Sequence, residues 1–237
     1  MRYFYVLLFF TTFINAQKIP PFPRDQHSYL GGEVGFYKDF QKILLEKKLQ
    51  PCANKQELFQ AKIKIQEDGA ASLFDSDKSS EENNQCAKLL TQEVLKDMSG
   101  WIPARIDGEV KTAGTSYAIF PDAFFGNFKE GYSAYKFSEP ARFKDGIQDF
   151  RYEVMKRVDP ENFYTKGSGP VVVHVRFVVN EEGKMEDIKL DKSSDLKEYD
   201  EMILYSLRSI KKKWTPGKIH GIPTKFRFVL PFSFQTD

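Results

Sequence analysis

The stretch that decides the fold lies in the last third of the chain, where residues 170–179 read PVVVHVRFVV. Successive side chains of a strand point to opposite faces, so this run places valines and a phenylalanine on one face and His174 and Arg176 on the other. The sequence NEEG follows at residues 180–183, and a glycine after two acidic residues is typical of a tight turn that needs a positive φ. These residues predict a β-hairpin.

A helix and a last strand follow this hairpin. Between residues 196 and 213 apolar side chains recur at the i, i+3, i+4, i+7 spacing of a helix that packs on a sheet. The segment GIPTKFRFVLP at residues 221–231 then alternates inward-facing aromatic side chains with outward-facing Lys225, Arg227 and Val229. The predicted order is strand, strand, helix, strand.

The first half of the chain repeats this order. The sequence DKSS at residues 77–80 recurs at residues 191–194, and WIPARIDG at residues 101–108 corresponds to WTPGKIHG at residues 214–221. Both matches fall in nearly the same register, which indicates a duplicated domain.

We therefore expect an α+β fold with two tandem domains. In each, a helix precedes strand, strand, helix and strand in a small antiparallel sheet, with the first helices at residues 33–48 and 146–157. The expected boundaries are residues 17–125 for the first domain, 126–145 for a connector and 146–237 for the second domain.

Composition excludes some function classes and favours none. The 237 residues include 35 basic and 33 acidic side chains, so no overall field favours nucleic acid. Three scattered histidines and two cysteines have no metal-ligand spacing, so we expect no metal and no cofactor. Neither His27 nor His220 has a paired nucleophile or carboxylate pattern, so we expect no enzymatic activity and no small-molecule substrate.

The N-terminus has the pattern of a secretory signal peptide. One arginine precedes a short apolar run that ends in Asn15-Ala16-Gln17, so we expect cleavage after Ala16 and a periplasmic or secreted protein. The alternative is an uncleaved inner-membrane anchor through residues 3–14, although a spanning helix needs roughly 20 apolar residues. In an exported chain Cys52 and Cys86 meet an oxidising compartment, so either a disulfide or two buried thiols fits the sequence.

The second copy resembles the C-terminal domain of TonB, the energy transducer of outer-membrane transport. The resemblance rests on the valine-rich strand, the Glu-Gly turn, the Lys-Ser-Ser at residues 192–194, the Trp-x-Pro-Gly-Lys at residues 214–218 and the aromatic last strand. The leader, with Phe22-Pro23 and the Gly-Gly-Glu at residues 31–33, is similar to segments that precede such domains in the Bacteroidetes group. The first copy resembles the family only weakly.

This resemblance implies peptide binding by β-strand addition to the last strand. The expected contact residues are Lys225, Arg227, Phe228 and Val229. The implied partner is an outer-membrane TonB-dependent receptor or another envelope protein, and the implied process is TonB-dependent transmembrane transport. The alternative function is that of a cell-envelope structural or adaptor protein, with peptidoglycan as a further candidate partner.

Overall fold

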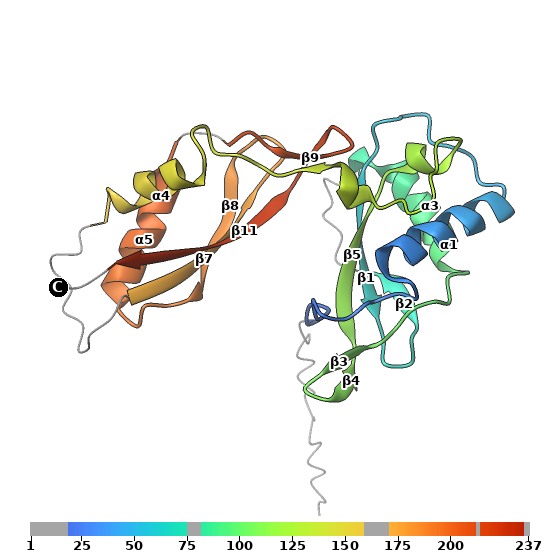
Figure 1. Cartoon of the computed structure of the whole chain (residues 1–237), viewed down its shortest axis with the longest axis horizontal. Helices are drawn as coiled ribbons and strands as arrows, with labels where there is room; N and C mark the ends of the chain where they lie inside the picture. Colours follow the sequence, from blue (N-terminus) through green and yellow to red (C-terminus); the bar gives the residue numbers. More distant parts are fainter. Residues whose placement is uncertain (1–18, 75–81, 159–170, 212–213, 235–237) are drawn as a thin grey trace, which may run out of the picture.

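The computed structural model describes residues 19–74, 82–158, 171–211 and 214–234. These residues form two hydrophobic cores, each packed against its own three-stranded antiparallel sheet (Figure 1). The predicted signal peptide, residues 1–16, lies outside the described residues. None of the helices in the described ranges has the length and hydrophobicity needed to cross a bilayer.

The first unit has a sheet of strand order β2-β1-β5, with helices on one of its faces. Strand β1 alternates because every second side chain, from Phe59 to Ile65, is fully buried under those helices. The elements are α1 (Gly32–Glu46), β1 (Phe59–Ile65), β2 (Ala71–Leu73), α3 (Gln85–Leu95), β3 (Ala104–Ile106), β4 (Glu109–Lys111), β5 (Ala113–Ile119) and the 3₁₀ helix η1 (Pro121–Phe124).

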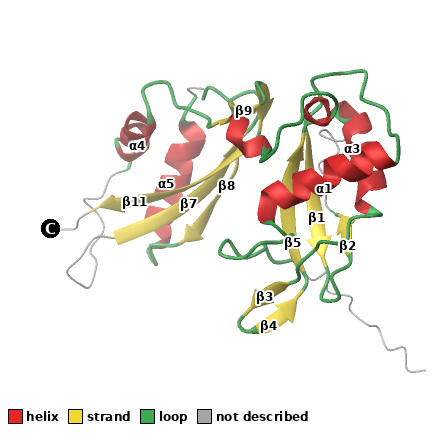
Figure 2. Ribbon diagram, turned by 45° about the vertical axis from the view of Figure 1, so that its right-hand side comes forward, coloured by secondary structure: helices red, strands yellow, loops and turns green. Residues whose placement is uncertain are grey.

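The second unit has a sheet of strand order β11-β7-β8, and its helices again lie on one face (Figure 2). The predicted helix stripe is present, since Tyr199, Ile203 and Leu207 are fully buried. The elements are α4 (Ile147–Met155), β7 (Val171–Val179), β8 (Met185–Lys192), α5 (Lys197–Ser209), β9 (Gly217–Ile219), β10 (Ile222–Thr224) and β11 (Phe226–Phe234). The mixture of helices with small antiparallel sheets is an α+β fold.

Each unit also contains a short hairpin that the sequence prediction omitted. The hairpins β3–β4 and β9–β10 lie between the second helix and the long last strand of each unit. Their turns have positive φ at two successive residues, Asp107-Gly108 and His220-Gly221, as two-residue type I′ turns require. The predicted last strand at residues 221–231 is therefore two strands, β10 and the longer β11.

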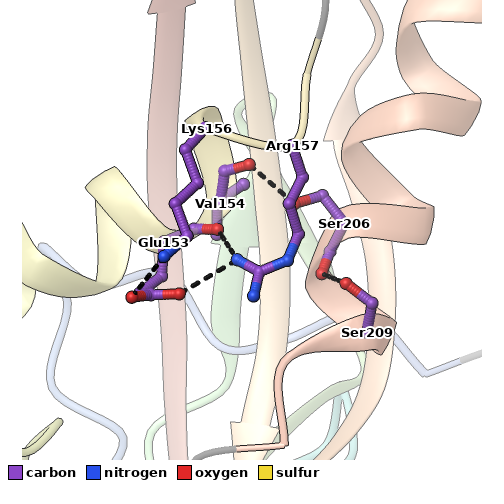
Figure 3. Close-up of polar contacts among 6 residues, drawn as sticks. All are labelled: Glu153, Val154, Lys156, Arg157, Ser206 and Ser209. Carbon is purple, nitrogen blue, oxygen red and sulfur yellow. Dashed lines mark hydrogen bonds and ion pairs between the residues drawn. The ribbon is translucent and has the colours of Figure 1, made fainter.

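Helices α4 and α5 are joined by polar contacts as well as by the core (Figure 3). The Ser206 hydroxyl of α5 donates to the carbonyl of Val154 at 2.6 Å. On α4 the Glu153 carboxylate accepts from Lys156 at 2.7 Å and from Arg157 at 3.0 Å. The Ser206 hydrogen bond joins the two helices, whereas the Glu153 contacts lie within α4 and its C-terminal end. Both helices lie on the same face of the sheet, and we call the opposite face of each sheet its outer face.

Residues 126–145 pack on both units. Tyr132 and Ala134 belong to the first core, whereas Ala141 and Phe143 belong to the second. The segment contains the 3₁₀ helix η2 (Ala134–Phe137) and strand β6 (Ser138–Glu139), which pairs with β9. The hairpin β9–β10 in turn places Ile219 in the first core. The chain between the domains is thus part of a packed junction.

Candidate functional site

Strand β11 is an edge strand of its sheet. It pairs with β7 in a regular antiparallel register from Phe226↔Val179 to Phe234↔Val171. Within the described residues no other strand pairs with β11, and we call its second side the outer edge of β11. An edge of this kind presents backbone N–H and C=O groups that can pair with another extended segment.

Pro231 shows which backbone groups of β11 point to the outer edge. Proline has no N–H, so it fits this ladder only where the nitrogen points away from β7. N–H and C=O groups alternate sides along an antiparallel strand, and the register between β11 and β7 has no irregularity. The N–H and C=O groups of Arg227 and Val229 therefore point to the outer edge, and those of Phe228 point to β7.

The four residues predicted to contact a peptide have different environments. Arg227 and Val229 are exposed on the outer face, where 46% of Val229 is accessible. Lys225 lies between β10 and β11, and its ammonium group is 3.2 Å from the carboxylate of Glu186. Phe228 instead packs in the second core, with its ring centroid 4.9 Å from that of Trp214. Its side chain is a structural one.

A cleft of about 570 Å³ lies between the two units. The outer face of the second sheet lines one side, and the first sheet with residues 19–22 lines the other. Its basic side chains are Lys62, Arg176, Lys189 and Arg227, and Asp187 is also present. Arg176 forms an ion pair with Asp191 at 3.0 Å. Among the residues that line the cleft, basic groups outnumber acidic ones.

Residues 20–22 lie along the outer edge of β5, which the sequence did not predict. The amide of Gly114 donates to the carbonyl of Pro20 at 2.8 Å, and the amide of Phe22 donates to the carbonyl of Gly114 at 2.8 Å. Together they form a parallel bridge between Pro21 and Gly114. A proline-rich leader is normally interpreted as a loop, so periodicity could not reveal this contact.

His220 lies at the junction between the units and serves packing. Its ring is stacked between Phe120 and Phe137, with a centroid distance of 4.3 Å to each. Its Nε2 atom is 2.9 Å from the hydroxyl of Tyr132. Burial lowers the pKa of His220 below its usual value. His174 lies at mid-strand in β7, opposite Pro231.

Cys52 and Cys86 form a disulfide, with their sulfur atoms 2.08 Å apart. In the described part of the chain they are also the centre of the one close group of His, Cys and acidic side chains, together with Glu57. The Glu57 carboxylate accepts from the amide of Ala87 at 2.8 Å, near the start of α3. Because the two sulfur atoms are bonded to each other, this group is a covalent link between α3 and the loop before β1.

Comparison with known families supports the sequence resemblance for the second unit. Residues 169–236 match the family model described as Gram-negative bacterial TonB protein C-terminal. Comparisons with curated proteins and with solved structures gave no match. The matched segment contains β7, β8, α5, the hairpin β9–β10 and all of β11. Residues 169–236 are thus similar to the TonB C-terminal family.

Proposed function

We propose that this protein is an exported binding module that docks a peptide segment of an outer-membrane transport protein by strand addition to β11. The observation that carries the proposal is the regular edge strand itself, whose backbone groups at Arg227 and Val229 point away from β7. Strand addition uses such groups for affinity and neighbouring side chains for specificity. The family match of residues 169–236 supports a role in TonB-dependent transport.

We further propose that the two units arose by duplication and that the chain acts in the periplasm after removal of residues 1–16. The common order of helix, two strands, helix, short hairpin and long strand supports duplication. The disulfide between Cys52 and Cys86 supports an oxidising compartment. The leader similarity to the Bacteroidetes group is consistent with this placement. Binding without catalysis is part of the same proposal.

The second candidate is a structural or adaptor protein of the cell envelope. One observation favours it, because the outer edge of β5 is already occupied by the chain's own residues 20–22. A protein that covers one of its edges in this way can use its remaining surfaces for fixed contacts, for example with peptidoglycan. Retained binding to purified peptidoglycan, together with no binding to receptor peptides, would favour this candidate.

The test is a calorimetric or NMR titration of the mature chain, from Gln17, with extended peptides from envelope receptors. We expect saturable binding that is lost in Val229→Pro, because proline removes the outward N–H while the ladder to β7 stays intact. Val229→Ala is the matched control, since it keeps the N–H and shortens only the side chain. No binding of any receptor peptide to a folded sample would refute docking at this edge.

A further inference from the structure

The leader of this chain shows how an extended segment adds to the last strand of a unit. At β5 the contact consists of one parallel bridge, with two hydrogen bonds of 2.8 Å to the amide and carbonyl of Gly114. The side chain of Phe22 packs partly buried against the first core. The first unit therefore already contains an example of strand addition at its last strand, β5.

The geometry of this bridge explains the unusual leader sequence PPFP at residues 20–23. The bridge needs only the carbonyl of Pro20 and the amide of Phe22. Proline is compatible with positions 20, 21 and 23 because none of them has to donate to β5. Its fixed φ also lowers the entropy lost when an extended segment binds. Phe22 is the single position in this run that has to carry an N–H.

Arg227 occupies in β11 the position that Gly114 occupies in β5. Gly114 pairs with Lys64 of β1, and Arg227 pairs with Val178 of β7. In each unit the next pair joins the first residue of the last strand to the last residue of the central strand, Ala113 to Ile65 and Phe226 to Val179. The amide and carbonyl of Arg227 are thus oriented like the groups of Gly114 that hold the leader.

The two positions differ in the space beside the backbone. A Cβ atom at Gly114 would lie 2.6 Å from the ring of Phe74 and 3.5 Å from Ile19, so the leader closes over a bare backbone. At β11 the corresponding side chain is the exposed Arg227, which faces the cleft together with Lys189. A ligand residue at the position of Ile19 would therefore lie beside a guanidinium group, where a carboxylate is favourable.

We propose that the outer edge of β11 binds a short, proline-flanked segment of a partner protein, parallel to β11 and centred on Arg227. This inference rests on the proposed function and specifies its ligand. The central residue of the segment does not donate a hydrogen bond, so proline fits there. An apolar residue with a free N–H follows directly after it, and an acidic residue lies two positions before the centre. Proline flanks keep the segment extended, and the acidic residue pairs with Arg227.

The probe is a synthetic peptide of residues 17–24, QKIPPFPR, titrated into the full mature chain and followed by NMR. We expect saturable shifts at β11 residues 226–230. A peptide with Ile19→Glu should bind about fivefold more tightly at low salt, as expected for one partly exposed ion pair. A peptide with Phe22→Pro should not bind, because it lacks the single required N–H.

Two protein variants isolate the contact at residue 227. Arg227→Pro removes the outward N–H and should weaken binding at least about tenfold. Arg227→Ala keeps that N–H but removes the guanidinium group, so it should lose the preference for the peptide with Ile19→Glu. Pro231 in the same strand indicates that proline is tolerated at positions of this orientation.

Three results would overturn the proposal. Shifts confined to β5 and residues 20–22 would mean that the peptide only exchanges with the leader. Concentration-dependent self-association through the leader would assign the edge to a second copy. No binding of QKIPPFPR, when receptor peptides bind and Val229→Pro abolishes that binding, would reject this ligand class and leave the proposed function standing. If receptor peptides also fail to bind, both proposals are rejected.

Discussion

The two units share an order of elements but differ at the edge of their last strands. In the first unit the leader covers the edge of β5 over a glycine, and in the second an arginine stands at the same register position. The disulfide also belongs to the first unit alone. Under the proposed function, the first unit is a fixed part of the scaffold and the second unit carries the binding edge. Each of the following predictions tests this contrast.

Removal of the disulfide should have the largest effect and should affect only the first unit. Cys52 and Cys86 are 34 residues apart, so a loop-entropy treatment gives a loss of about 4 kcal/mol in the double variant Cys52→Ala/Cys86→Ala. Scanning calorimetry should show a lower transition for the first unit and an unchanged one for the second. A wild-type sample treated with reductant is the control. Equal destabilisation of both units would show that they unfold together.

The two hairpin glycines should differ in their tolerance of alanine. Gly69 and Gly183 both have positive φ, but only at Gly183 would a Cβ atom clash, 2.0 Å from the carbonyl oxygen of Trp214. We expect Gly69→Ala to cost about 1 to 2 kcal/mol for the backbone conformation. Gly183→Ala should cost about 3 kcal/mol or more, because the segment at Trp214 has to move as well.

Urea unfolding of the two glycine variants, followed by a probe in each unit, measures both costs. Each variant is the control for the other, because both glycines have positive φ but only Gly183 lies close to a tryptophan carbonyl. In the first unit the nearest atom to that Cβ position is the carbonyl oxygen of Trp101 at 3.9 Å, which is an ordinary contact. Equal costs would contradict the close approach of the Trp214 carbonyl to Gly183.

Release of residues 20–22 from β5 should leave the first unit with an open outer edge, as in the second unit. Phe22→Pro removes the one leader N–H that bonds to Gly114, and we expect a cost of about 1 kcal/mol. Hydrogen exchange at the amide of Gly114 should become faster, while exchange in β11 stays unchanged. Phe22→Leu keeps the N–H and an apolar side chain, so its exchange should remain slow. Slow exchange in both variants would mean that other contacts hold the leader.

Local patterns in the sequence predicted the features that depend on neighbouring residues. The alternation of β7, the helical stripe with Tyr199 and Ile203, and the positive φ of Gly183 follow from periods of a few residues. The dipeptide Asp107-Gly108 is typical of a two-residue hairpin turn, but the sequence prediction did not use it. It is the strongest available indication of the short hairpins.

Such local patterns could not predict the contacts between segments that are distant in the sequence. The bridge of Pro21 to Gly114, the insertion of Ile219 into the first core and the pairing of Cys52 with Cys86 join parts of the chain that only the fold brings together. The sequence allowed both a disulfide and two thiols because spacing gives no distance. The candidate edge itself was predictable from the last strand, but not the burial of Phe228, whose side chain completes the core around Trp214.

The smallest predicted effect concerns the junction that joins the units. Burial lowers the pKa of His220 from an ordinary value of about 6.5, so the unfolded chain takes up a proton at a higher pH than the folded one. Acidification through pH 6.5 should therefore slightly destabilise the packed junction, and the loss should level off below the folded pKa. The contribution is fully present above pH 6.5.

Urea unfolding of the wild type and of His220→Phe between pH 7.5 and pH 5 isolates the contribution of His220 to the pH dependence of stability. The variant keeps a ring between Phe120 and Phe137 but does not titrate, so its stability should change less over this range. Asp122, Glu130 and Lys136 line the same hollow and are present in both proteins. Subtracting the two curves removes their contribution. Identical pH profiles would show that His220 keeps its ordinary pKa, and the junction would then be insensitive to mild acid.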